Sequence, residues 1–229
     1  MERVPHKMSK ILSSEIFGRD LLKWWKNNKR EFPWRRTRNS YKILISEILL
    51  HRTRANQVTP VYLEFLERFP TIAALSEACI EDLKTMLYSL GLSWRTELIH
   101  KMALEIVNKY KGKIPSKTEE LTTLPGVGHY IAAAVRCFCH GYPEILLDTN
   151  TVRIIGRFFG IEKTDGSRRS RQFRELYESL IDQNHPRDFN YAMIDLGALV
   201  CKPKNPICSI CPISKKCKYR IEEAREKNS

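Results

Sequence analysis

Residues 124–135 read LPGVGHYIAAAV and interrupt an otherwise helical sequence with Pro125, Gly126 and Gly128. Apolar residues recur at helical spacing on both sides, so we predict two helices joined by a tight turn near residues 118–139. Glycine permits a positive φ and lets the backbone approach another molecule closely. The N–H groups at the start of the second helix could then bind a phosphate oxygen, although the same residues could form an ordinary interhelical turn.

Helical periodicity extends over most of the chain on both sides of this turn. The segments YKILISEILL at 41–50 and VTPVYLEFLERF at 58–69 carry apolar residues at helical spacing. Only Ile145–Leu147 could form a strand, and it is too short to build a sheet. We therefore predict an all-α fold of roughly nine or ten helices, with a charged tail at 221–229 that frays.

The balance of charge favours a polyanionic partner. The chain of 229 residues has 39 Lys and Arg against 26 Asp and Glu, a net charge of +13. This excess fits nucleic acid, although a basic surface could simply maintain solubility. No apolar run is long enough for a membrane span, and the N-terminus lacks the apolar core of an export signal. We expect a cytoplasmic protein, acting on nucleoid-associated DNA and not on membranes.

Four of the seven cysteines crowd into one C-terminal loop. They are separated by six, two and five residues: Cys201, Cys208, Cys211 and Cys217. An odd total and the lack of an export signal argue against disulfides. Four thiolates can enclose zinc or a [4Fe–4S] cluster, and the uneven spacing leans away from structural zinc, which more often uses two Cys-x2-Cys pairs. Because no cysteine is missing from the set, we expect a structural centre and not a catalytic one.

Both motifs resemble the same family. The string LPGVGHYIAAAV, followed by Asp148, Thr149 and Asn150, resembles the helix–hairpin–helix, Gly/Pro-rich loop and Asp signature of the endonuclease III superfamily of DNA glycosylases. The cysteine spacing is also that of the iron–sulfur loop in this family, and the resemblance extends from about Phe32 to Cys217.

The resemblance implies two helical lobes with the active site in the cleft between them. Residues 31–147 would form a six-helix lobe that contains the hairpin. Residues 1–30 and 148–229 would form the iron–sulfur lobe, with the cluster loop at 201–217. The resemblance further implies a [4Fe–4S] cluster as cofactor, and double-stranded DNA with a mismatched or damaged base as the partner of a monomer.

Asp148 and Glu47 are the acidic candidates for catalysis. The family places an Asp at the mouth of the pocket, where a carboxylate can stabilise the positive charge that base loss leaves on the sugar. An Asp at position 148 could also be the N-cap of a helix that starts near Thr151. Glu47 is the only acid in the apolar segment 41–50. Burying a carboxylate there would destabilise the fold unless the group has a polar partner or a functional role. The family implies a place in the base pocket, whereas the alternative is a surface pair with Arg52 or Arg54.

Tyr130 separates the branches of the family. Bifunctional members carry at this position a Lys that forms a Schiff base with the sugar, and Tyr cannot do so. Tyr130 would instead border the extruded base, and strand-nicking lyase activity should be weak or absent. A nicking glycosylase for oxidised pyrimidines is therefore disfavoured. A non-enzymatic DNA-binding or redox-sensing protein would not need Asp148 and Glu47 together.

Two branches of the family remain. One excises adenine from A·G or A·8-oxoguanine pairs, and the other excises thymine and uracil opposite guanine. Adenine-specific members usually read Gln-Gln-Thr where this chain has His51, Arg52 and Thr53, and they carry Gly at the position of Thr149. They usually also have a further domain that reads oxidised guanine. We therefore expect a thymine or uracil mismatch glycosylase, with adenine excision as the alternative.

A base inside a duplex must be flipped out before its sugar bond can be attacked. By resemblance, Leu50, His51 and Arg52 would fill the gap together with Trp94, which could stack as a wedge or could instead be a core aromatic. Arg52 could donate to guanine edges. The hairpin residues Gly126, Gly128 and His129 would bind the backbone, and Asn150 would support the Asp148 loop.

Overall fold

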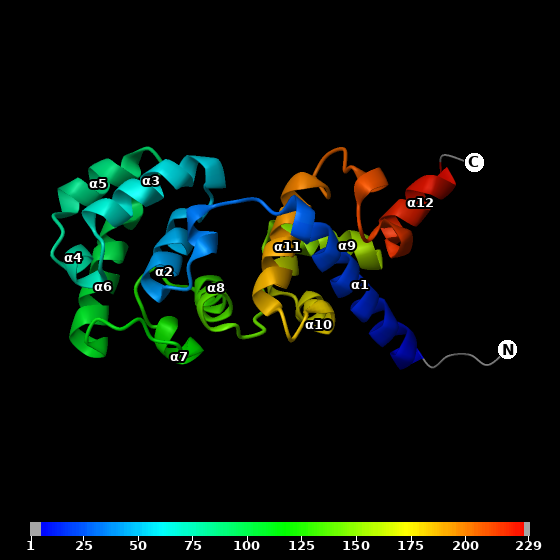
Figure 1. Cartoon of the computed structure of the whole chain (residues 1–229), viewed down its shortest axis with the longest axis horizontal. Coiled ribbons are helices and arrows are strands. Elements are labelled where there is room, and N and C mark those ends of the chain that lie inside the picture. The colour runs from blue at the N-terminus through cyan, green and yellow to red at the C-terminus, as the bar shows by residue number, and fades with distance from the viewer. Residues whose placement is uncertain (1–5, 227–229) are drawn as a thin grey trace. The chain divides into compact units, whose positions relative to one another are not determined.

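The computed structural model describes residues 6–226 and divides the chain into two compact units (Figure 1). The hairpin unit is Glu31–Tyr142, and the cysteine unit combines the chain up to Arg30 with the chain from Pro143 onward. Every regular element in the described residues is an α-helix or a 3-10 helix, so the all-α prediction is confirmed. Within the described part of the chain, no helix has both the length and the apolar character needed to cross a bilayer.

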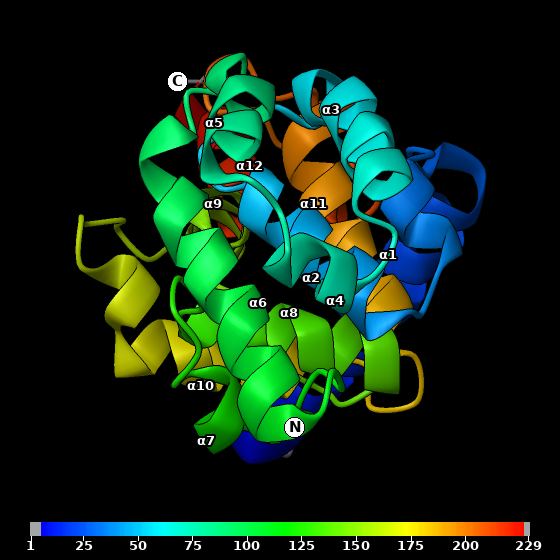
Figure 2. The same ribbon diagram turned by 90° about the vertical axis from the view of Figure 1, so that its left-hand side faces the viewer.

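The hairpin unit is built around one buried helix. Its elements are η1 (Pro33–Arg36), α2 (Ser40–Leu49), α3 (Ala55–Arg68), α4 (Ile72–Ser76), α5 (Ile80–Tyr88), η2 (Ser93–Arg95), α6 (Thr96–Tyr110), α7 (Thr118–Leu121) and α8 (His129–His140). The side chain of Asn39 caps α2 by accepting a hydrogen bond from the Lys42 N–H at 3.0 Å. Helix α2 packs against α3 and α8, and α4 packs against α6 (Figure 2).

Aromatic side chains fill the space beside α2. The rings of Phe32 and Trp34 stack at 4.9 Å, and Trp34 meets Tyr62 edge-on at 5.4 Å. The hydroxyl of Tyr41 donates to the Phe69 carbonyl at 2.6 Å. Burial raises the pKa of Tyr41, and it raises the pKa of Tyr62 to about 12.

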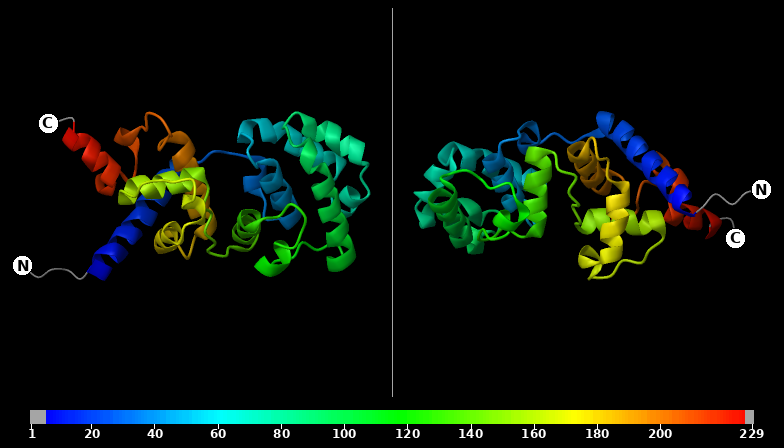
Figure 3. Two further views of the ribbon diagram at one scale, coloured as in Figure 1. Left: turned by 180° about the vertical axis from the view of Figure 1, so that it is seen from behind. Right: turned by 90° about the horizontal axis from the view of Figure 1, so that it is seen from below.

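The cysteine unit joins the beginning of the chain to its end. Its elements are α1 (His6–Asn28), α9 (Thr149–Phe159), η3 (Ser167–Arg169), α10 (Arg171–Leu180), α11 (Pro186–Leu199), η4 (Cys208–Ile210), η5 (Ser214–Lys216) and α12 (Lys218–Glu226). Helix α1 packs against α10 and α11 (Figure 3). The fully buried Asp195 on α11 accepts hydrogen bonds from Trp25 Nε1 at 2.9 Å and from Arg30 Nε at 2.6 Å. These bonds tie the end of α1 to α11.

The structure differs from the sequence predictions in two segments. The unit boundary lies after Tyr142, whereas 147 was expected, because Ile145 and Leu147 pack against the core of the cysteine unit. The charged tail is not frayed up to Glu226 but forms α12, in which Tyr219 packs against the same core. With α4 and α12, the described chain has twelve α-helices. Residues 227–229 lie outside the described residues.

Candidate active site and cysteine pocket

Asp148 is the N-cap of α9 and is held in place by its own cap. Its Oδ1 accepts hydrogen bonds from the N–H groups of Asn150 at 2.8 Å and Thr151 at 2.7 Å, and its Oδ2 accepts from Asn150 Nδ2 at 3.0 Å. The Thr151 hydroxyl accepts from the Asp148 N–H at 2.8 Å and completes a capping box. The predicted N-cap role is therefore real. It also fixes a half-buried carboxylate in one orientation, as charge stabilisation requires.

Arg153 links this carboxylate to the segment that carries the first cysteine. Its Nη2 donates to Asn150 Oδ1 and to the Gly197 carbonyl, both at 2.9 Å, and its Nε donates to the Cys201 carbonyl at 2.8 Å. Burial lowers the pKa of the Arg153 guanidinium. A Cβ on Gly197 would lie 2.7 Å from the Asn150 Cβ, so glycine is needed for this approach of α11 to α9.

Sequence reasoning did not find Arg153 or Arg157. The only signal was two arginines four residues apart in the segment 152–159, which otherwise has no polar side chain. Arg157 donates from Nη1 to the Lys202 carbonyl at 2.7 Å and from Nη2 to the Pro203 carbonyl at 2.9 Å. Helix α9 therefore carries the candidate catalytic carboxylate at its N-terminus and holds the cysteine loop with its two arginines.

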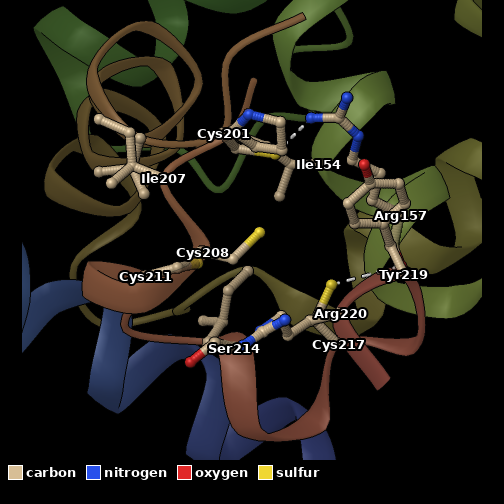
Figure 4. Close-up of a pocket in the computed structure, with 13 residues that line it drawn as sticks. Ile154, Arg157, Cys201, Ile207, Cys208, Cys211, Ser214, Cys217, Tyr219 and Arg220 are labelled. Atoms are coloured by element: carbon tan, nitrogen blue, oxygen red, sulfur yellow. Dashed lines mark hydrogen bonds between the residues drawn. The ribbon is translucent and has the colours of Figure 1, made fainter. Parts of the chain in front are cut away.

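The four clustered cysteines line one pocket of about 20 Å³ together with Ile154, Arg157 and Tyr219 (Figure 4). The sulfur atoms of Cys208 and Cys217 face the common space in Figure 4. Arg157 Nη1 lies 3.5 Å from the Cys201 sulfur, and the Cys217 thiol donates to the Arg157 carbonyl at 3.4 Å. Residues that are separated along the loop are thus brought together as thiols around one space.

The chemistry of this pocket fits a soft metal centre. Burial raises the pKa of Cys208 and of Cys217, and it raises the pKa of Cys211 to about 12. A metal cation reverses this effect, since a coordinating thiol is deprotonated. In residues 6–226, no three His, Cys, Asp or Glu side chains are grouped as ready-made ligands of a single metal ion. The donor set, four thiols around one space, remains suited to an iron–sulfur cluster.

The hairpin comprises α7, a turn and α8. Gly126 has φ +79° and needs glycine, and the Val127 N–H donates to the Leu124 carbonyl at 3.0 Å. Gly128 has φ −88° and is the extended N-cap of α8, so the positive φ that glycine permits is used at Gly126 and not at this residue. A Cβ on Gly128 would meet nothing within 4 Å. The fold itself therefore does not require glycine there, and α8 begins without a side-chain cap.

Tyr130 and His129 occupy the first turn of α8. His129 is exposed and Tyr130 is half-buried, so both lie beside the capless N-terminus of that helix. The side chain at position 130 is a phenol, which offers no amine for an imine.

Glu47 lies on α2 among buried apolar residues. It is 8% exposed and is the only acid on this helix. This burial excludes the surface position that a pair with Arg52 or Arg54 would have occupied. Asp148 belongs to the cysteine unit, whereas Glu47 and Tyr130 belong to the hairpin unit.

The loop after α2 is tightly wound. The Leu50 N–H donates to the Ser46 carbonyl at 2.9 Å, and the Thr53 N–H donates to the Leu50 carbonyl at 3.2 Å. Arg52 is exposed and has φ +63°, an uncommon and strained conformation for a residue with a side chain. His51, at the same turn, is half-buried.

Trp94 lies in η2 and is 62% exposed, so the alternative of a core aromatic is excluded. The Arg95 guanidinium carbon lies 4.8 Å from the centre of the indole ring. An exposed indole with a cation on one face can offer its surface to another ring.

Comparison with known proteins identifies the family. Residues 45–179 match the HhH-GPD superfamily base excision DNA repair protein family. A thymine/uracil-DNA glycosylase of Methanothermobacter thermautotrophicus is 35% identical over 90% of this chain and 93% of its own length. An adenine DNA glycosylase of Buchnera aphidicola subsp. Baizongia pistaciae is 32% identical over 90% of this chain but only 59% of its own length.

A solved structure agrees with these sequence matches. The structure of a thermostable thymine-DNA glycosylase superposes with a TM-score of 0.87 at 34% identity and covers 92% of this chain and 98% of that one. The chain therefore belongs to the HhH-GPD superfamily of base excision DNA repair proteins.

Proposed function

We propose that this protein is a monofunctional DNA glycosylase that flips out thymine or uracil opposite guanine in double-stranded DNA and excises it. The observation that carries the proposal is the Asp148 carboxylate, held by Asn150 and Thr151 at the start of α9. The identity to thymine/uracil-DNA glycosylases over nearly their whole length supports the choice of base. The adenine-specific relatives also support a DNA glycosylase, but this chain spans only about 59% of the length of two of them.

The chemistry follows from the residues present. As the bond between C1′ of the sugar and the base nitrogen breaks, positive charge develops on the sugar, and the Asp148 carboxylate stabilises it. The bonding electrons leave with the base, and water adds its oxygen to C1′. The proton that water loses neutralises the departing base, so the products are an abasic site and the free base. Glu47 contacts the flipped base or the attacking water. Tyr130 borders the base and cannot form an imine, so the DNA strand stays intact.

We propose that Cys201, Cys208, Cys211 and Cys217 hold a [4Fe–4S] cluster. When bound, it would supply a structural crosslink for the loop, whose surrounding lysines could then face DNA phosphates. Iron and acid-labile sulfide in a ratio near one, with the visible absorption of such a cluster, are the expected result. Stoichiometric zinc without sulfide would contradict this part of the proposal.

Base release from labelled duplexes tests the activity. Duplexes with G·T, G·U, A·G and A·8-oxoguanine are incubated with the protein, and each is analysed with and without alkali. We expect loss of thymine and uracil with strand breaks only after alkali, and no loss from a matched A·T duplex. Adenine release would establish the alternative, and breaks without alkali would refute monofunctional chemistry. Sedimentation of the active protein tests our further proposal that it acts as a monomer.

A further inference from the structure

Arg95 is a buried cation that its own surroundings leave unsatisfied. The residue is 8% exposed, and its Nε and Nη1 atoms have no hydrogen-bond partner in the described part of the chain. Neither does Arg95 form an ion pair with any described residue. A buried guanidinium usually has such partners, because removing its hydration otherwise destabilises the fold. The burial of this side chain therefore needs an explanation outside the isolated unit.

A second cation adds to this cost. Burial, and to a lesser extent the charge of Arg52, lower the pKa of the Arg95 guanidinium. Arg52 is exposed and is held by the turn after α2 with φ +63°. The positive charge of Arg52, on a turn with a strained backbone, thus adds to the electrostatic cost of burying Arg95. A local conflict of this kind is typical of a binding site.

The surroundings also include a stacking surface. Arg95 lies over one face of Trp94, at 4.8 Å from the ring centre, and Trp94 is 62% exposed. Helix α5, which packs against η2, ends with another aromatic side chain, Tyr88, which is 79% exposed. Exposed aromatic rings beside arginines are the composition of surfaces that bind nucleic acid.

We infer that Arg95 and Arg52 together bind one phosphodiester group of the DNA backbone beside Trp94. The inference rests on the proposed function, because it requires DNA as the partner. A phosphate accepts hydrogen bonds from both guanidinium groups and also neutralises their repulsion. A guanine edge could accept hydrogen bonds from arginine, but it is neutral and would leave the two charges unbalanced. The charges therefore favour a phosphate over a base as the ligand of this pair.

The substitution Arg95→Met distinguishes a binding role from a structural one. Methionine has a similar length and no charge, so it removes the unsatisfied groups from the interior. We expect an unchanged or higher Tm and roughly tenfold weaker binding to a G·T duplex. The slope of log K against log salt concentration should also fall by about one, because one counterion fewer is released on binding. Arg52→Ala should produce the same reduction. Arg68→Met, at an exposed arginine that pairs with Asp82, removes the same charge and should leave the salt dependence unchanged.

Neutral methylphosphonate linkages, introduced singly along both strands, identify the phosphate. In the wild-type protein, one linkage should weaken binding by roughly tenfold, and in Arg95→Met the same linkage should have no further effect. Equal losses at every linkage in both proteins, or a Tm that falls with Arg95→Met, would overturn the inference. If the wild-type protein releases the base but no linkage is coupled to Arg95, only the inference fails. If it neither binds nor cleaves any duplex, the proposed function fails with it.

Discussion

Asn150 holds both oxygens of the Asp148 carboxylate, through its N–H at 2.8 Å and its side-chain amide at 3.0 Å. The two interpretations of Asp148, as helix cap and as catalytic group, are thus one arrangement. The hydrogen bonds that satisfy the start of α9 also set the direction of the carboxylate.

Replacing Asp148 with Asn separates the cap from the charge. Asparagine is as good an N-cap as aspartate and keeps one acceptor for the N–H groups of Asn150 and Thr151, but its amide NH2 replaces the oxygen that accepts from the Asn150 side chain. The free energy of unfolding should therefore fall by only about 1–2 kcal/mol. Base release should slow by about 100- to 1,000-fold because the stabilising charge is lost. Single-turnover assays on a G·T duplex, with urea unfolding in parallel, measure both quantities. Unaltered release by the variant would show that Asp148 is only a cap.

The substitution Tyr130→Lys should introduce lyase chemistry. An amine at this position could attack C1′ of the sugar and form an imine that borohydride traps on the DNA. Strand breaks should then appear without alkali, while the wild-type protein requires it. Tyr130→Phe is the matched control and should not nick. Equal trapping of all three proteins would show that another amine acts.

The two hairpin glycines should fail in different ways. Gly126→Ala places a side chain at φ +79°, and we expect a loss of about 1 kcal/mol or more in unfolding free energy. Gly128→Ala has φ −88° and open space, so stability should be unchanged. If the backbone at Gly128 contacts a DNA phosphate, the Cβ that the substitution adds should still weaken DNA binding several-fold. Thermal melts and binding isotherms of both variants test this contrast.

The hydrogen bonds of Arg153 predict a stability effect. Arg153→Gln leaves acceptors on Asn150, Gly197 and Cys201 without their donor, at a cost of about 2–4 kcal/mol in unfolding free energy. Arg174→Gln on the exposed face of α10 is the control and should change stability by less than about 0.5 kcal/mol. Equal shifts of the two urea midpoints would contradict this role.

Alkaline pH should destabilise the hairpin unit through Tyr62. Its folded pKa, about 12, exceeds the unfolded value of 10.0, so its contribution is complete below pH 10 and is lost as the pH rises toward 12. The expected loss over this range is about 2 kcal/mol. Tyr62→Phe cannot ionise and should show a smaller decrease. Unfolding free energies of both proteins at pH 9, 10 and 11 provide the measurement (roughly 0.3 kcal/mol should separate pH 9 from pH 10, and about 1 kcal/mol pH 10 from pH 11).

The sequence predicted the elements that follow from the local spacing of apolar, glycine and proline residues. The apolar run at 41–50 became the buried α2, and the break at 124–128 became the hairpin turn. Helix α12 was missed because its sequence KYRIEEARE has no series of apolar residues at helical spacing. Its contact with the core, through Tyr219, depends on tertiary packing and is not visible in the local sequence. Arg153 and Arg95 were missed for a related reason. Arg153 donates hydrogen bonds to carbonyls more than 40 residues away along the chain. Arg95 stands out only because two of its buried nitrogen atoms have no hydrogen-bond partner in the described residues.

The cysteine unit consists of two segments that are separated along the chain by residues 31–142, and this affects how it folds during synthesis. Helix α1 is synthesised before residues 31–142, but α10 and α11, against which it packs, are synthesised only after them. The hairpin unit is continuous and can fold as soon as it emerges, whereas α1 must wait with its apolar residues Phe17 and Leu21 uncovered. During that interval the nascent chain is a natural client for a chaperone. A released, truncated chain that ends near residue 145 should therefore have a protease-resistant core at 31–142 and a sensitive α1.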